Sequence, residues 1–195
     1  EVAERLGEGG SLPAELLADL NRLSALVEDL LLLARVDADA RPPARPGPVD
    51  CRALLSEVTA AYAGRRVPVT IAPGPEVKVL ADADELRRAV DNLVANAVRH
   101  ATSQVELAAG HDRDQVVLTV RDDGPGVAEP DRERVFERFT RLDDARARDM
   151  GGSGLGLPIA RELVRRAGGD VELIDADPPW RLSAVIRLPA ARSIS

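Results

Sequence analysis

The stretch RDDGPGVAEP, residues 121–130, follows the run QVVLTV, residues 115–120, whose alternating β-branched residues predict a strand. A hairpin would need only a short Asn-Gly or Asp-Gly turn after such a strand. Here two acids and a Gly-Pro-Gly corner are followed by more than twenty polar, Arg-rich residues before the next firm helical pattern. Loops of that length are usually functional, so we expect this one to carry function.

Composition excludes several classes of function. At 195 residues and 45% apolar content, the chain can bury the core of one ordinary domain and has room for an appendage. A net charge of −7 argues against nucleic-acid and anionic-membrane binding, because both need a basic face, and we predict no nucleic-acid partner. The single cysteine, Cys51, cannot form an internal disulfide, and the two histidines give no metal-ligand spacing. A cytoplasmic setting follows.

The N-terminal residues 1–38 have the pattern of a helix from a bundle. The apolar residues Leu16, Leu20, Leu23 and Val27 step by four and three, which is the rhythm of a helix that packs along a seam. The alternative is a helix that folds against its own domain. No apolar run approaches the roughly 20 residues that span a bilayer, so we expect a soluble fragment. Because the helical pattern is already under way where the chain starts, we expect a piece of a longer protein.

Four prolines in residues 39–49 predict an extended linker, followed by a domain at residues 50–190 and a short tail at 191–195. Asp50 can cap one helix, and Asp82 with Glu85 forms a capping box for another. We expect helices at 51–63, 83–101 and about 154–167, and strands at 67–72, 77–82, 103–109, 115–121, 170–176 and 181–188. This mixture predicts an α+β, two-layer α/β sandwich: one mixed sheet with helices on one face.

Two further features point to an anionic ligand. A second glycine cluster, GGSGLGL at residues 151–157, closes the long loop and opens a helix, whose N-terminus offers free N–H groups to an anion. The alternative is a flexible hinge. On the helix at 83–101, Asn92, Asn96, Arg99 and His100 share one face, although Asn is a poor helix former. That face is either a solvated surface or a site in which amide oxygen binds Mg²⁺.

Together these segments resemble the catalytic ATP-binding domain of sensor histidine kinases, within the wider GHKL superfamily that also contains type II topoisomerases and heat-shock chaperone ATPases. DNLVANAVRHA, residues 91–101, resembles the N box, and DDGPG, residues 122–126, the first glycine box. ERVFERFTRLD, residues 133–143, resembles the F box, and GGSGLGLPIA, residues 151–160, the second glycine box. The resemblance covers about residues 51–189, and the helix before it is similar to part of the dimerisation and phosphoacceptor domain.

The resemblance implies a Bergerat fold that binds ATP and Mg²⁺. Asp122 would accept a hydrogen bond from the adenine amine, Asn96 would hold Mg²⁺, and Arg141 would reach the γ-phosphate. The loop 127–152 would be an ATP lid that Phe136 and Phe139 pin to the neighbouring helical domain, unless both are ordinary core residues. The implied ATP-binding residues are Asn92, Asn96, Arg99, His100, Asp122, Gly124, Gly126, Val127, Phe136, Phe139, Gly152, Ser153, Gly154, Leu155, Gly156 and Leu157, and the implied catalytic residues are Asn96 and Arg141.

One position favours phosphotransfer over hydrolysis. The hydrolysing members of the superfamily use a Glu on the N-box helix to activate water, whereas Asn92 stands at the corresponding position here, and an amide is no general base. Neutral histidine is already a nucleophile. The resemblance therefore implies a histidine kinase with a response-regulator receiver domain as partner, and a membrane-anchored homodimer that associates through the bundle.

Two departures from the family pattern leave alternatives open. Residues 1–99 contain no histidine, so the phosphoacceptor lies upstream or on a partner. The family's Gly-Ser/Thr-x-Phe run before the last strand is replaced by WRLSA, residues 180–184. A non-catalytic nucleotide sensor of the same fold and an anti-sigma-type serine kinase are the alternative functions.

Overall fold

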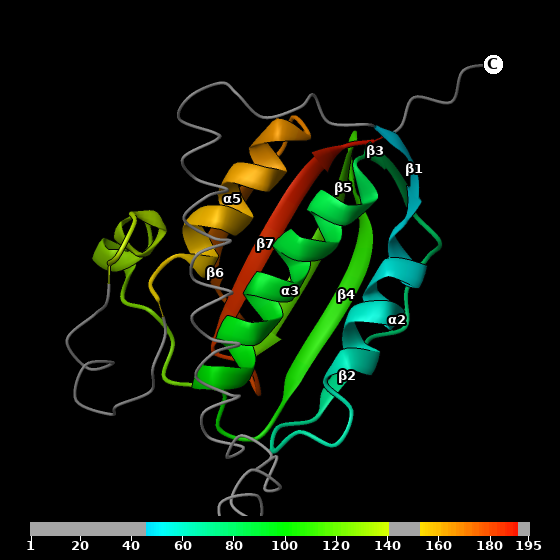
Figure 1. Ribbon diagram of the computed structural model, residues 1–195. Helices are drawn as coiled ribbons and strands as arrows, with labels where there is room; N and C mark the ends of the chain where they lie inside the picture. Colours follow the sequence, from blue (N-terminus) through cyan, green and yellow to red (C-terminus); the bar gives the residue numbers. More distant parts are fainter. Residues whose placement is uncertain (1–45, 141–152, 191–195) are drawn as a thin grey trace, which may run out of the picture. The chain divides into compact units, whose positions relative to one another are not determined.

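The computed structural model describes residues 46–140 and 153–190 (Figure 1). The chain divides into two compact units, residues 1–41 and 42–195, and the description below concerns the second. The predicted helical segment 1–38, most of the predicted linker, residues 141–152 of the predicted lid and the tail 191–195 lie outside the described residues. Among the described residues, we find no helix with the length and apolar character that a membrane crossing requires.

A five-stranded mixed sheet forms one layer of the domain. Its strand order is β2-β4-β5-β7-β6, in which β2 pairs with β4 in parallel and the other neighbours are antiparallel. The strands are β2 (Val69–Ile71), β4 (Val105–Asp112), β5 (Gln115–Asp122), β6 (Asp170–Asp175) and β7 (Leu182–Pro189). Along β5, Val116, Leu118 and Val120 are buried and alternate with half-buried residues, as a sheet covered on one face requires. The mixed sheet that the sequence predicts is confirmed.

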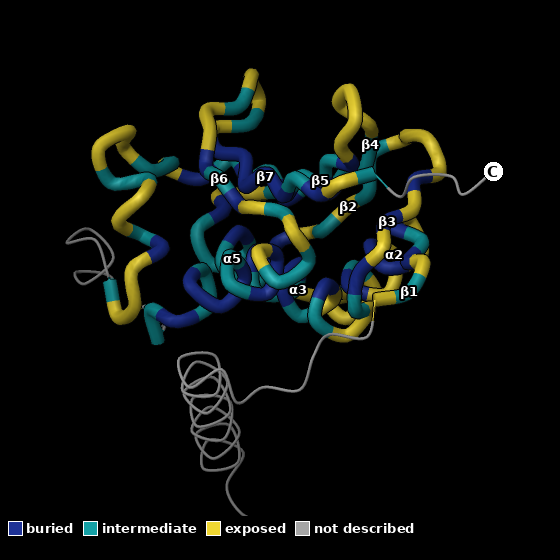
Figure 2. The backbone as a smooth tube through the Cα atoms, turned by 90° about the horizontal axis from the view of Figure 1, so that it is seen from above, coloured by how far each residue is buried: buried dark blue, intermediate teal, exposed yellow. Residues whose placement is uncertain are grey.

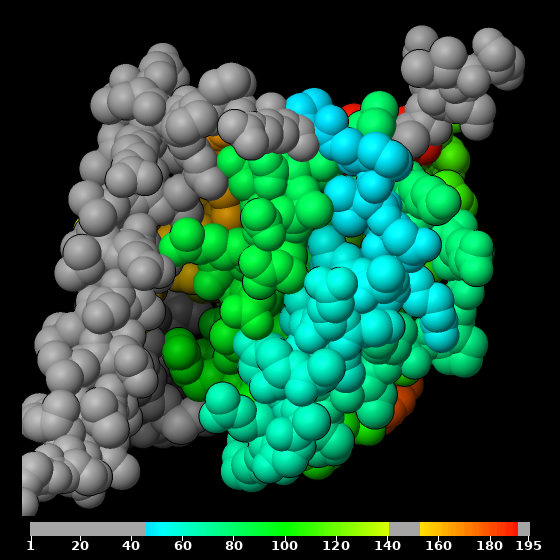
Figure 3. Space-filling view, turned by 45° about the vertical axis from the view of Figure 1, so that its right-hand side comes forward, coloured from blue at the N-terminus to red at the C-terminus, as the bar shows by residue number. Residues whose placement is uncertain are grey.

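The second layer consists of α2 (Cys51–Ala61), α3 (Ala83–His100) and α5 (Gly156–Arg166), which all lie on the same face of the sheet (Figure 2). Figure 3 shows α2 and α3 side by side, covering much of the sheet from that side. Each helix buries one apolar stripe, and on α3 this stripe consists of Leu86, Ala89, Val90, Leu93, Val94 and Ala97. The two-layer α/β sandwich is therefore confirmed.

The start of α3 follows the capping signal in the sequence. The Asp82 side chain accepts hydrogen bonds from the backbone N–H groups of Asp84 and Glu85, at 3.1 and 3.2 Å. These bonds satisfy two amides that have no partner inside the helix. The Glu85 carboxylate also reaches the guanidinium of Arg166, at 3.2 Å, and thereby ties the start of α3 to the end of α5.

The structure contains a strand at the end of the predicted linker, which we did not predict. Strand β1 (Gly47–Asp50) pairs antiparallel with β3 (Lys78–Ala81) in a separate two-stranded sheet. Pro48 is compatible with this strand because β1 lies at an edge, where a missing N–H is tolerated. Asp50 ends β1 and caps α2 through a 3.0 Å hydrogen bond from the Ala53 amide, as predicted. Burial raises the pKa of the Cys51 thiol in the first turn to about 11.

The hairpin between β4 and β5 is tighter than the sequence suggests. We expected residues 110–114 to form the connection, but β4 continues to Asp112, which pairs with Gln115. The turn therefore consists of Arg113 and Asp114 alone, with Arg113 at φ = 54°. A two-residue turn with positive φ matches the right-handed twist of the flanking strands, which explains why the pairing extends this far.

Candidate nucleotide site

Asp122 ends β5 and points to the helix-covered side of the sheet. It pairs across the sheet with Val105 of β4 and with Leu182 of β7, both of which are buried apolar residues. Asp122 itself is only 5% exposed. Burial among these neighbours raises the pKa of its carboxyl to about 6, although a hydrogen bond from the Gly124 amide acts in the opposite direction. A carboxylate in such surroundings is stabilised by a ligand that donates a hydrogen bond to it.

Gly124 turns the chain directly against the end of α3. A Cβ atom at this position would lie 2.5 Å from the carbonyl oxygen of His100 and 2.8 Å from Oδ1 of Asp122. The Gly124 amide donates a 2.9 Å hydrogen bond to the same Oδ1. Two residues later, Gly126 has φ = 79°, which side chains disfavour. The first glycine cluster is therefore a close backbone crossing, and it holds the end of β5 next to the end of α3.

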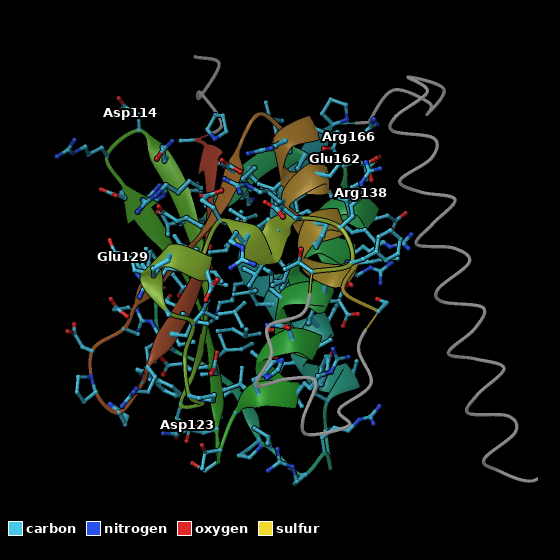
Figure 4. All side chains as sticks on the ribbon, turned by 90° about the vertical axis from the view of Figure 1, so that its left-hand side faces the viewer. Asp114, Asp123, Glu129, Arg138, Glu162 and Arg166 are labelled. Carbon is cyan, nitrogen blue, oxygen red and sulfur yellow. The ribbon has the colours of Figure 1, made fainter. Side chains whose placement is uncertain are left out.

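Asp123 has a structural role that sequence reasoning missed. Its carboxylate accepts hydrogen bonds from three successive amides, those of Thr102, Ser103 and Gln104, at 2.9 to 3.3 Å, and a further one from the Ser103 hydroxyl. Hydrogen bonds from Ser103, Gln104 and Thr102 outweigh the cost of burial and lower the pKa of Asp123 to about 2. Figure 4 shows Asp123 at the end of β5, beside the last turn of α3. Asp123 thus locks the loop after α3 to the first glycine corner.

The polar face of α3 is partly enclosed. All four predicted residues on this face are half-buried, whereas a fully solvated face would expose them: Asn92, Asn96, Arg99 and His100. Within the described residues, the amide nitrogen of Asn92 is buried and has no hydrogen-bond partner. Such a donor costs free energy unless a ligand accepts from it. The Asn92 side chain lies next to Gly156, where an added Cβ would be 3.7 Å from the Asn92 Oδ1 atom.

The second glycine cluster opens α5 without a side-chain cap. The residue before the helix, Leu155, makes no capping hydrogen bond, and its own amide donates to the hydroxyl of Ser153, at 3.2 Å. Gly156 and Leu157 of the first turn are half-buried. The N–H groups of a first turn have no acceptor inside the helix, so they can donate hydrogen bonds to an anion. The site residues Asn92 and Gly156 are therefore neighbours in space, 64 positions apart in sequence.

The described first part of the predicted lid, residues 127–140, is held on α5. Phe136, in the 3-10 turn η3 (Arg134–Phe136), is 9% exposed, and the guanidinium of Arg161 lies 4.6 Å from its ring centroid. Phe136 is thus a core residue of its own domain, as in the alternative interpretation. Phe139 differs: it is 62% exposed and has φ = 62°. Whether it contacts another domain stays a prediction.

The turn between β6 and β7 closes the side of the first corner. Its last residue, Arg181, donates its amide to the carbonyl oxygen of Asp122, at 2.9 Å, and the half-buried Trp180 precedes it. On the same side, Arg132 donates to the carbonyl oxygen of Val127, at 3.2 Å, and also pairs with Asp175 of β6. The region that departs from the family pattern therefore lies beside the predicted adenine-binding acid.

The structure brings most of the predicted site residues together around the C-terminal half of α3. Gly124, hydrogen-bonded to Asp122, packs against His100 at its end, whereas Gly156 lies beside its middle at Asn92. The predicted residues Arg141 and Gly152 lie outside the described residues. Besides Asp123, sequence reasoning missed Arg161, because a surface arginine on a helix has no local signal for its partners.

Known proteins are similar to this chain in sequence and in architecture. Residues 81–192 match the family model described as histidine kinase-, DNA gyrase B-, and HSP90-like ATPase. The sensor histidine kinase CpxA of Escherichia coli K12 is 34% identical over 194 residues, which cover 96% of this chain and 41% of CpxA. The structure of the mycobacterial sensor histidine kinase MprB is 30% identical with a TM-score of 0.65, and covers 75% of this chain and 98% of that one. Full-length ShkA in complex with AMPPNP is 31% identical with a TM-score of 0.74, over 96% of this chain and 41% of that one.

This chain therefore belongs to the histidine kinase-, DNA gyrase B- and HSP90-like ATPase family, and the relatives that it resembles within that family are sensor histidine kinases. It spans about two fifths of the length of CpxA. The Bergerat fold implied by the sequence motifs is confirmed.

Proposed function

We propose that this chain is the catalytic core of a two-component sensor histidine kinase. It binds ATP with Mg²⁺ and positions the γ-phosphoryl group for transfer to a histidine of a helical dimerisation bundle, from which an aspartate of a response-regulator receiver domain receives it. In this proposal the domain is cytoplasmic and belongs to a membrane-anchored homodimer. The observation that carries the proposal is the buried carboxyl of Asp122 between two apolar cross-strand neighbours.

Asp122 fits the amino edge of adenine. An ionised carboxylate is acceptor-only, so it binds a base that presents an N–H group and rejects one that presents a carbonyl oxygen. The apolar side chains of Val105 and Leu182 flank it in the sheet and leave few competing polar groups there. The charge-assisted hydrogen bond would also offset the unfavourable burial of this carboxylate.

The other end of the site fits phosphate groups. The buried, unpartnered amide nitrogen of Asn92 can donate to a phosphate oxygen, as can the uncapped backbone amides at the start of α5. Because Gly156 has no Cβ, a phosphate group can approach the backbone closely there; a Cβ would narrow the space beside Asn92. Asn96, one turn further along α3, would supply an amide oxygen to Mg²⁺, which would neutralise charge on the phosphates.

The helix offers no base to activate water at this position. Asn92 is an amide. Its neighbour Asp91 accepts a 2.9 Å hydrogen bond from the hydroxyl of Tyr62, the C-cap residue of α2. Burial and the contact with Asp91 raise the pKa of Tyr62. The same hydrogen bond occupies the Asp91 carboxylate. Phosphotransfer to a histidine needs no such base, because positioning and charge neutralisation supply most of the catalysis.

Calorimetric titration of Mg·ADP and Mg·ATP tests the binding step. We expect Asp122→Asn to weaken affinity by about tenfold to a hundredfold, since a hydrogen bond to a charged group contributes about 1.5–3 kcal/mol. Asp123→Asn is the matched control: it makes the same charge change one residue away, at a carboxylate that the loop after α3 already occupies. We expect its affinity to stay within about threefold of the wild type. Equal losses of affinity in both variants would contradict the proposal that Asp122 binds the adenine base.

A second experiment tests phosphotransfer. The chain is mixed with Mg·ATP and a helical bundle that carries a phosphoacceptor histidine, and the phosphorylated product is treated with acid. We expect acid-labile phosphate on the bundle, as phosphohistidine requires. Nucleotide binding without any phosphorylation would favour the non-catalytic sensor, and acid-stable phosphate would favour a serine kinase.

A further inference from the structure

Arg161 on α5 joins three segments that are distant in sequence. Its guanidinium pairs with Glu133 before η3, at 2.6 Å, and with Asp170 at the start of β6, at 2.8 Å. The same group lies over the ring of Phe136. The Arg161 side chain is only 14% exposed, whereas the side chains of its partners Glu133 and Asp170 are 76% and 51% exposed. They raise the pKa of Arg161 and lower the pKa values of Glu133 and Asp170.

The Glu133 and Phe136 contacts fix the position of the segment that follows them. Three residues after Phe136, Phe139 donates its amide to the carbonyl oxygen of Gly154, at 3.1 Å. A Cβ on Gly154 would lie only 3.0 Å from the Cα of Phe139, so the two backbones are in direct contact. Phe139 holds a positive φ that is unfavourable for a residue with a side chain. A conformation of this kind persists only where its surroundings enforce it.

Gly154 in turn leads into Leu155 and Gly156, at the start of α5 beside Asn92. A continuous series of contacts therefore runs from the Arg161 side chain through η3 and Phe139 to the second glycine cluster. Arg161 lies in the second turn of α5, and the N-terminus of the same helix lies beside Asn92. The segment around Phe139 packs on that N-terminus, and Arg161 fixes this segment.

We propose that Arg161 is a positioning residue for the phosphate-binding end of the nucleotide site, which it controls by holding the Phe139 backbone against Gly154. The proposal rests on the proposed function. It assigns to Arg161 no contact with the nucleotide. The pair with Glu133 and the stacking on Phe136 carry this role, whereas the pair with Asp170 joins α5 to β6 and contributes to stability.

The test compares Arg161→Gln, Glu133→Gln and Asp170→Asn with Arg187→Gln in the full chain. Arg187 is the matched control, because it also pairs with an acid of β6, Glu172 at 2.8 Å, and its contacts among the described residues do not include a residue of either glycine cluster. We expect Arg161→Gln and Glu133→Gln to weaken Mg·ADP binding by about tenfold, and the double variant to be no weaker than Arg161→Gln alone. Asp170→Asn and Arg187→Gln should bind Mg·ADP within about threefold of the wild type.

Two readouts separate positioning from a general loss of structure. Adenosine, which lacks phosphates, should bind Arg161→Gln as it binds the wild type, because the Asp122 end is unchanged. Arg161→Lys, which keeps the charge but lacks the fork that reaches two carboxylates, should bind Mg·ADP with intermediate affinity. Equal losses for adenosine and Mg·ADP, or a loss in Asp170→Asn that matches Arg161→Gln, would overturn the proposal.

Hydrogen exchange makes the inference independent of nucleotide binding. The Phe139 amide, which is bonded to Gly154, should exchange faster in Arg161→Gln and in Glu133→Gln than in Arg187→Gln, with no ligand present. If the Phe139 amide exchanges at the same rate in all three variants, the inference is wrong, even if the wild type binds nucleotide. If the wild type binds no nucleotide, the proposed function fails, and the exchange experiment alone decides whether Arg161 positions Gly154.

Discussion

The two glycine corners at either end of the long loop are held in place by different means. At the first corner, the Asp123 carboxylate receives three backbone amides and Gly124 packs on the carbonyl of His100. At the second corner, Gly154 contacts a strained Phe139, and the helix that follows has no side-chain cap. At the first corner, hydrogen bonds within the protein therefore hold the backbone in place, and among the described residues only the buried Asp122 carboxyl there calls for a ligand. At the second corner, the first turn of α5 has N–H groups without acceptors inside the helix, where phosphates would bind. The difference teaches that one corner is set by the fold and the other is completed by a ligand.

Alanine at the two corners should expose this difference most clearly. We expect Gly124→Ala to lower the free energy of unfolding by about 3 kcal/mol, because its Cβ would overlap the backbone oxygen of His100. Gly156→Ala is the control, since among the described residues its Cβ would meet Asn92, at an ordinary contact distance of 3.7 Å. It should cost less than about 1 kcal/mol by urea denaturation. Similar losses at both positions would mean that the corners are equally constrained.

Asp122→Asn should stabilise the protein without ligand. The folded carboxyl has a pKa of about 6, above its ordinary 3.8, so folding favours the protonated form. The folded state then binds more protons than the unfolded state between these values, and wild-type stability falls as pH rises from about 4 to about 6. At pH 7–8 we expect the variant to be more stable by about 1–3 kcal/mol. The gap should close below about pH 4, and a gap that does not depend on pH would contradict this cause.

The same acid should make nucleotide affinity depend on pH. If the ionised form of Asp122 accepts from adenine, affinity for Mg·ADP is constant above about pH 6 and falls by up to about tenfold for each pH unit below it. Binding between pH 6 and 7 should release protons, which calorimetry in buffers of different ionisation enthalpy measures. Asp123→Asn should show the same profile, whereas Asp122→Asn should not.

Asp123→Ala should act in the opposite direction and more weakly. We expect it to lower the free energy of unfolding at pH 7 by about 1–2 kcal/mol, as the loss of a cap does. Because the folded pKa of Asp123 is lowered to about 2, its contribution is complete above pH 4 and disappears as pH falls from about 4 to 2. Thermal melts of wild type and variant across that range measure it. Two neighbouring acids thus make the free energy of unfolding depend on pH in opposite directions.

The smallest effect should come from the strained residue of the second corner. Phe139→Gly removes the unfavourable positive φ and loses little packing, since the side chain is 62% exposed. We expect a gain in stability of up to about 1 kcal/mol. Phe139→Ala keeps the strain and should show no gain. A loss on Phe139→Gly would mean that the aromatic ring itself stabilises this corner.

Much of this architecture could be predicted from the sequence because its signals are local. The cap at Asp82, the polar face of α3 and the strand pattern before Asp122 each lie within one element, and the structure contains them as predicted. Strand β1 was missed because the prolines of residues 39–49 suggest a linker, and only pairing with residues 78–81 makes it a strand. The tight turn at Arg113 was missed for a similar reason: strand pairing decides where it begins.

The supports of the site were harder to predict than the site itself. Asp123 looks like a second copy of Asp122, and what separates them is a loop 20 residues upstream. The partners of Arg161 lie 28 residues before it and 9 residues after it, on two other segments. Motif patterns identify residues that a ligand would touch, whereas the residues that hold them depend on long-range packing.

Trp180 gives the first corner a built-in optical probe. It is the single tryptophan of the chain, and the next residue is bonded through its amide to the backbone of Asp122. Emission excited at the red edge of the protein absorption band therefore comes from one known place, a few residues from the predicted base site. A change in its wavelength or quenching on mixing with adenosine would report occupancy of that corner in a stopped-flow instrument, with no dye attached and no residue replaced.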